Sequence, residues 1–209
     1  MIDYYKIVEP FEKEIIIKKS RFITTLLPIE NASDAEEKLA ILNKKYSDAT
    51  HNCYAYISNI IATEQRFSDN GEPQGTAGIP MLDVLKKRRV YMTLAVVTRY
   101  FGGIKLGASG LVRAYSESVA TALDEADIRK FVVSDIANVV ISYNVYEKIN
   151  EFISLSEGKV ITTEYSDNVS ITFAVPTDNY EKLKEKIIDF TNGRAVINHL
   201  NKDYIDYKI

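Results

Sequence analysis

Hydrophobic residues along the chain follow two periods, about 2 residues in some segments and about 3.6 in others. Short runs rich in β-branched and aromatic residues predict strands, and these runs lie at 14–18, 21–27, 51–59, 90–101, 136–144, 159–165, 169–175 and 195–200. Apolar residues three or four positions apart predict helices, which we expect at 35–46, 77–87, 111–126, 146–157 and 176–191. Together these elements predict an α+β protein.

The pattern restarts near residue 131. Beyond that point the predicted order is strand, helix, strand, strand, helix, strand, which is typical of the ferredoxin-like fold. A chain of 209 residues is long enough for two small domains. We therefore predict an N-terminal α+β domain over 1–131 and a C-terminal ferredoxin-like domain over 132–209.

Two serines are candidate helix caps. The sequence Ser33-Asp-Ala-Glu36 matches a capping box, in which the two side chains satisfy each other's free backbone N–H groups. Ser109 stands just before the apolar stripe of the helix expected at 111–126, and we expect it to cap that helix.

Composition narrows the cellular context. No apolar run approaches the ~20 residues that a membrane-spanning helix needs, and the first ten residues lack the apolar segment of a signal peptide. The single cysteine, Cys53, excludes an internal disulfide and fits a reducing compartment. We therefore expect a cytoplasmic protein without a membrane partner. Because HExxH and CxxC motifs are absent, we expect no metal and no cofactor.

The stretch RYFGGIKLGASG, residues 99–110, joins a predicted strand to a predicted helix. Glycine is costly to order, so four glycines here need a reason. A strand, a glycine loop and a helix start can direct free backbone N–H groups at an anion. Lys105 lies within the loop, and no acidic residue occurs from 84 to 116, although the net charge of the chain is −3.

We therefore interpret this segment as a candidate phosphate or nucleic-acid site. Its candidate residues are Arg99, Gly102, Gly103, Lys105, Gly107, Ser109 and Arg113, together with Lys86, Lys87, Arg88 and Arg89. The alternative is structural: Gly107 and Gly110 let the helix pack closely on the sheet, and the cations form a solvated surface.

A second group of candidate residues precedes this loop. His51 and Cys53 share one face of a predicted strand, and Asp69 and Glu72 follow in the turn-rich loop SDNGEPQGTAGIP. A thiol beside an imidazole can form a nucleophile pair, and a histidine with two carboxylates can support hydrolysis or hold a metal. The simpler interpretation is a buried cysteine and ordinary turn residues. If the protein is an enzyme, His51, Asp69 and Glu72 are its candidate catalytic residues.

Three segments, HNCYAYI, SDNGEPQGTAGIPML and VVTRYFGGIKLGASGLVRAY, resemble the signature segments of the IMPACT/YigZ family in order and spacing. The resemblance implies an N-terminal domain with the fold of the second domain of a small-subunit ribosomal protein. It also implies a C-terminal domain similar to the last domain of elongation factor G. This chain departs from the family pattern at Asn70, where an aspartate is usual, and at Ser109, where glycine is common.

Three hypotheses for function follow. The first is a nucleic-acid-binding or ribosome-associated factor linked to regulation of translation, with RNA, the ribosome or a protein of translation control as partner. The second is a small hydrolase whose cleft lies between the two glycine-rich loops. The third is a protein-interaction adaptor, for which the fourteen tyrosines offer surface anchors.

Overall fold

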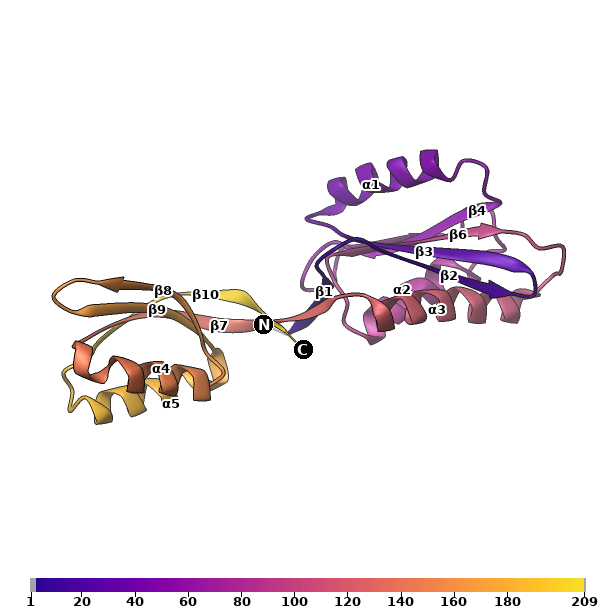
Figure 1. Cartoon of the computed structure of the whole chain (residues 1–209). Coiled ribbons are helices and arrows are strands. Elements are labelled where there is room, and N and C mark those ends of the chain that lie inside the picture. Colours follow the sequence, from indigo (N-terminus) through magenta and orange to yellow (C-terminus); the bar gives the residue numbers. More distant parts are fainter. Residues whose placement is uncertain (1–2, 209) are drawn as a thin grey trace. The chain divides into compact units, whose positions relative to one another are not determined.

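The computed structural model describes residues 3–208, and these divide into two compact units, Tyr4–Lys130 and Phe131–Tyr207. Within these residues the strands form two five-stranded sheets, each packed against its own helices (Figure 1). The predicted α+β class is confirmed.

The N-terminal unit is built on a five-stranded sheet in the order β2-β3-β6-β4-β5, with every neighbouring pair antiparallel. Its strands are β2 (Phe11–Ile17), β3 (Ser20–Pro28), β4 (His51–Ile57), β5 (Gln65–Ser68) and β6 (Thr93–Tyr100). A further short strand, β1 (Tyr4–Ile7), pairs with β7 (Ile128–Ile141). The sequence did not predict β1 or β5, because each has only four residues.

Helices cover both faces of this sheet. One face packs against α1 (Ala32–Lys45), and the other packs against α2 (Gly78–Lys87) and α3 (Ala108–Glu125) (Figure 1). Strand β6 is therefore buried along nearly its whole length: Val96 joins the cluster under α1, whereas Val97 joins the cluster under α2 and α3. Its sequence is continuously apolar in the middle because water reaches neither face.

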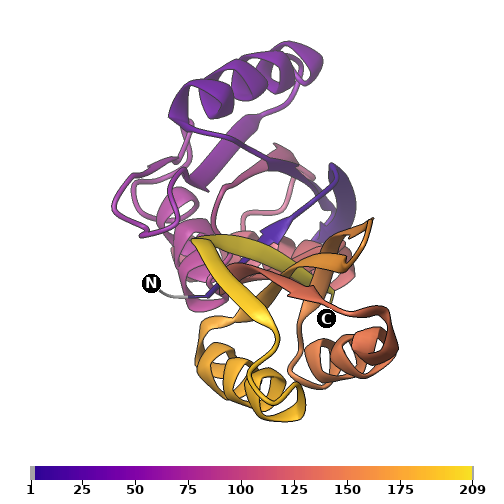
Figure 2. The same cartoon turned by 90° about the vertical axis from the view of Figure 1, so that its left-hand side faces the viewer.

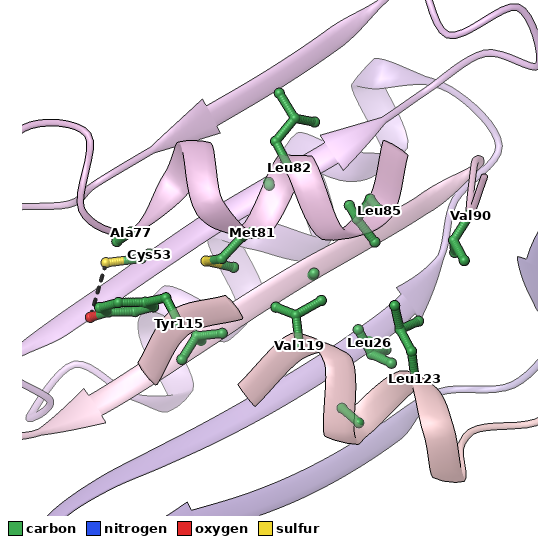
Figure 3. Close-up of a cluster of buried hydrophobic side chains, with 14 of the residues drawn as sticks. Leu26, Cys53, Ala77, Met81, Leu82, Leu85, Val90, Tyr115, Val119 and Leu123 are labelled. Carbon is green, nitrogen blue, oxygen red and sulfur yellow. Dashed lines mark hydrogen bonds between the residues drawn. The ribbon is translucent and has the colours of Figure 1, made fainter. Parts of the chain in front are cut away.

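The larger core lies between the sheet and the helix pair α2 and α3. Figure 3 shows Met81 and Leu85 of α2 beside Tyr115, Val119 and Leu123 of α3, all of them buried. These positions recur at helical spacing, which is why the sequence pattern located both helices. The packing fixes the N-terminus of α3 at the end of β6, where the glycine loop lies.

The C-terminal unit has the order β7, α4, β8, β9, α5, β10, and the sheet that contains β7 has the order β1-β7-β9-β8, with β10 also paired to β7. Its remaining elements are a 3-10 turn at Tyr143–Val145, α4 (Tyr146–Leu155), β8 (Lys159–Tyr165), β9 (Val169–Pro176), α5 (Thr177–Phe190) and β10 (Val196–Lys208). Both helices lie on one face of the sheet (Figures 1 and 2). This is the predicted ferredoxin-like arrangement, although β10 continues well past the predicted strand end at residue 200.

The predicted capping box at the start of α1 is wrong. Asn31 is the N-cap, and its side-chain oxygen accepts a hydrogen bond from the Asp34 N–H at 3.0 Å. Glu36 accepts hydrogen bonds from the Tyr56 hydroxyl and from Arg66 instead. The helix therefore begins two residues earlier than the Ser33 cap implied.

We expect Asn31→Ala to lower the free energy of unfolding by about 1 kcal/mol, because it removes the cap acceptor. The neighbouring change Ser33→Ala, at an exposed position, is the matched control and should stay within about 0.5 kcal/mol. Urea unfolding followed by circular dichroism measures both. An effect of Ser33→Ala as large as that of Asn31→Ala would contradict the observed cap.

Candidate functional site

Asp69 organises the first glycine-rich loop from within. Its carboxylate accepts hydrogen bonds from the backbone N–H groups of Gly75, Ala77 and Gly78, at 2.8, 3.0 and 2.8 Å. These donors lie at the start of α2, where free N–H groups favour a negative charge. The Asp69 carboxylate thus holds the loop to the helix, and Asp69 does not line the pocket described below.

Glu72 and Arg99 form a buried ion pair at the end of β6. Arg99 Nη1 lies 2.5 Å from Glu72 Oε1, and the Tyr115 hydroxyl donates to the same oxygen at 2.8 Å. The two charged side chains are only 6% and 4% exposed. The Arg99 guanidinium also lies over the rings of Phe22 and Phe101. Arg99 is therefore a neutralised, fixed cation, in contrast to the freely available one that the sequence suggested.

His51 faces this pair from β4. Its Nδ1 lies 2.8 Å from the carbonyl oxygen of Asn70, which can only accept, so Nδ1 carries a proton. Its Nε2 lies 3.8 Å from Glu72 Oε2, which is longer than a hydrogen bond. Gly71 makes this arrangement possible: it has a φ of +85°, and a Cβ there would lie 3.3 Å from the imidazole.

Cys53 is part of the core beneath this group. Its S–H has two acceptors within reach, the carbonyl oxygen of Asp69 at 2.9 Å and the Tyr115 hydroxyl at 3.3 Å, and the second contact is dashed in Figure 3. Burial raises the pKa of the thiol to about 12. The thiol therefore stays protonated at neutral pH, and this geometry does not support the hypothesis of a cysteine–histidine nucleophile pair.

A pocket of about 470 Å³ opens above these residues. Its polar lining includes His51, Glu72, Arg99 and Lys105, and its apolar lining includes Pro73, Phe101, Leu106 and Leu111. Leu106 also lines a neighbouring hollow of about 340 Å³, together with Lys18, Ser109, Arg113 and Glu117. The first volume is in the range of small-molecule sites.

The second glycine-rich loop forms one wall of the pocket. Two of its N–H groups are used internally, Phe101 N–H by Thr50 Oγ1 and Gly102 N–H by Ser20 Oγ. From Gly103 to Gly110, no N–H group has an acceptor within residues 3–208. Helix α3 begins after Gly107, which has a φ of +76°, and no side chain caps it. The expected Ser109 cap is therefore wrong, because Ser109 already lies in the first turn.

The structure places most of the predicted anion-site residues around this helix start. They are Arg99, Gly102, Gly103, Lys105, Gly107, Ser109 and Arg113. It adds two lysines that the sequence did not single out, Lys18 and Lys19, which form the turn between β2 and β3. This turn lies against the loop, since a Cβ on Gly102 would be 2.0 Å from the Lys19 carbonyl carbon.

Lys86, Lys87, Arg88 and Arg89 lie elsewhere. Arg88 forms an ion pair with Asp124, in the last turn of α3. The eighteen residues of α3 span about 27 Å at 1.5 Å per residue, so this basic cluster is at the far end of the helix from the glycine loop. The basic residues between positions 84 and 116 are thus divided between two regions, one near each end of α3.

Within residues 3–208, no group of three or more histidine, cysteine, aspartate or glutamate side chains is placed to hold a metal ion. Among the same residues, no helix has both the length and the apolar character needed to cross a membrane.

The fold and this pocket define a two-domain α+β protein with a candidate ligand site in its N-terminal unit. Residues 18–123 match the Impact N-terminal domain, and residues 139–194 match a domain of unknown function, DUF1949. The chain therefore belongs to the IMPACT family, and the resemblance found in the sequence is confirmed.

The matches to two bacterial relatives cover most of this chain. The chain is 39% identical over 203 residues to the IMPACT family member YvyE of Bacillus subtilis (strain 168), covering 97% of this chain and 94% of that protein. It is 35% identical to the IMPACT family member YigZ of Escherichia coli (strain K12), covering 85% and 88%. A crystal structure of a hypothetical protein matches with a TM-score of 0.60 at 31% identity, covering 96% and 98%.

We expect Gly102→Ala to destabilise the N-terminal unit by about 3 kcal/mol, because the new Cβ would overlap the backbone of Lys19. Gly103→Ala is the matched control: nothing lies within 4 Å of its Cβ, and only its φ of +84° is unfavourable, at a cost of about 1 kcal/mol. Thermal or urea unfolding distinguishes the two. Equal losses would show that the contact between this loop and the β2–β3 turn is not a constraint.

Proposed function

We propose that the protein binds RNA through its N-terminal unit, with the sugar–phosphate backbone lying across the start of α3. The observation that carries this proposal is the gathering of unused backbone N–H groups and exposed cations at one place. Such N–H groups, aligned with a helix dipole, favour phosphate oxygens. The link to translation rests on the ribosomal-protein-like and elongation-factor-like folds that the family resemblance implies.

The cations around the helix start are available to a ligand. Lys18, Lys19, Lys105 and Arg113 are exposed, and within residues 3–208 none of them forms an ion pair. The overall charge of −3 means that attraction must be local to this face. Contacts to phosphates orient RNA but read little sequence, so this surface alone predicts salt-sensitive binding with weak sequence preference.

The double variant Lys105→Ala, Arg113→Ala should weaken binding of a single-stranded RNA oligonucleotide by about tenfold at low salt. The slope of log affinity against log salt concentration should also become shallower by about 1.4, because each phosphate contact to a single strand contributes about 0.7 to that slope. Fluorescence anisotropy at several salt concentrations measures both quantities. Unchanged affinity and slope would contradict the proposal.

The matched control is Lys86→Ala, Lys87→Ala, which removes the same charge at the other end of the unit. It should leave affinity and salt slope nearly unchanged. Equal effects of the two double variants would mean that net charge, and not the helix start, governs binding. A protein partner retained at high salt in a pull-down would favour the interaction-adaptor hypothesis, which stays a prediction.

Hydrolysis is a second candidate function, because His51 and Glu72 line the same pocket. The Asn70 carbonyl fixes the proton on Nδ1, so that Nε2 has the lone pair that a general base requires, and His51 lines the pocket. Glu72 is paired to Arg99 and therefore charged and fixed. Water is then the nucleophile, since the Cys53 thiol stays protonated.

If the protein is a hydrolase, His51→Ala should abolish turnover of a responsive ester, peptide or phosphoester while the thermal midpoint stays close to that of the wild type. A broad substrate panel identifies the responsive compound first. Lys87→Ala, distant from the pocket, serves as the control. A panel without any wild-type turnover would remove this candidate.

A further inference from the structure

The floor of the 470 Å³ pocket presents two hydrogen-bond acceptors that the protein itself does not satisfy. Glu72 Oε1 accepts hydrogen bonds from Arg99 and from the Tyr115 hydroxyl. Oε2 of the same carboxylate has no hydrogen-bond donor within residues 3–208, although the Glu72 side chain is only 4% exposed. His51 Nε2 is likewise without a donor or acceptor at hydrogen-bond distance in that range. Because Nδ1 holds the proton of the neutral ring, Nε2 offers a lone pair.

His51 Nε2 and Glu72 Oε2 lie 3.8 Å apart, so a ligand with two adjacent hydrogen-bond donors could bind both. The charges of the pocket decide what kind of donor fits. Arg99 already neutralises Glu72, and Lys105 adds a positive charge to the lining. A ligand ammonium group would therefore be repelled, whereas neutral N–H groups are accepted. The ligand that matches this pocket is a neutral, donor-bearing group joined to an anion.

The walls of the pocket add a shape requirement. Phe101 is 48% exposed and contributes an aromatic ring, and Pro73, Leu106 and Leu111 contribute apolar surface. Such a lining favours a flat ring system. At the rim lie Lys105 and the unused N–H groups at the start of α3, which favour a phosphate.

We propose that the pocket binds the guanine base of a guanosine nucleotide, with its phosphate toward Lys105 and the start of α3. Among the four RNA bases, guanine alone carries two adjacent donors, N1–H and the N2 amino group, on its Watson–Crick edge. These face Glu72 Oε2 and His51 Nε2. Free guanosine monophosphate and a guanosine within RNA present the same base and phosphate to the pocket. The inference rests on the proposed RNA binding only in taking RNA as the source of that guanosine.

Isothermal titration of the full chain with nucleoside monophosphates tests the pocket directly. Guanosine monophosphate should bind about tenfold or more tightly than inosine monophosphate, which lacks only the N2 amino group, and more tightly than the adenosine and uridine compounds. This comparison uses the wild-type protein, so it does not depend on any variant folding. Equal affinities for the guanosine and inosine compounds would overturn the assignment.

Two variants separate base recognition from phosphate binding. His51→Ala should reduce the ratio of guanosine to inosine affinities severalfold, whereas Lys105→Ala should weaken all nucleotides and leave that ratio unchanged. Circular dichroism establishes that each variant is folded. An unchanged ratio in folded His51→Ala would overturn the role assigned to this imidazole.

Oligonucleotides distinguish the two sources of guanosine. A uridine-rich strand with one central guanosine should bind more tightly than the same strand with inosine at that position. If the guanosine and inosine strands bind with equal affinity and guanosine monophosphate does not bind, the guanine assignment fails while the RNA proposal stands. If guanosine monophosphate binds selectively but no strand binds, the pocket assignment stands and the RNA proposal fails.

Discussion

The buried ion pair between Glu72 and Arg99 is the constraint on which the site depends. It joins the first glycine-rich loop to the end of β6, and the Tyr115 hydroxyl extends it to α3. A charge placed in such a dry position is tolerated only while its partner is present, and the loss of one partner typically costs about 3–5 kcal/mol. The pair therefore holds the first glycine-rich loop, the end of β6 and α3 together. It also determines which polar atoms of the pocket floor are left without a partner in the protein.

Most of the fold could be predicted from the sequence, because the buried face of a helix or strand requires apolar residues at regular spacing. The centre of β6 is apolar throughout since both of its faces are covered, and Met81 and Leu85 recur at helical spacing since α2 packs by one side. Short β1 and β5 carry too few residues for any period. The start of α1 was misplaced at Ser33, because Asn31 and Ser33 are both of residue types that cap helices and local sequence does not decide between them.

The site was predictable only in parts. His51, Glu72 and Arg99 were each singled out, but they were assigned to two different sites, because the contact between positions 72 and 99 depends on tertiary packing. Tyr115 lies in the helix that the apolar pattern predicts at 111–126, but nothing in the local sequence indicates that its hydroxyl donates to Glu72. Lys18 and Lys19 reach the glycine loop because β3 pairs with β6, with Arg21 opposite Tyr100, and that pairing has no local signal.

The position of Cys53 has a consequence for the chemistry that this protein can tolerate. Oxidants and alkylating agents attack thiolates that they can reach, and this sulfur is fully buried, protonated and occupied by two oxygen acceptors. As the chain contains a single cysteine, the folded molecule has no accessible sulfhydryl with which to form a mixed disulfide. Its binding surfaces should therefore remain the same whether the surroundings are reducing or mildly oxidising.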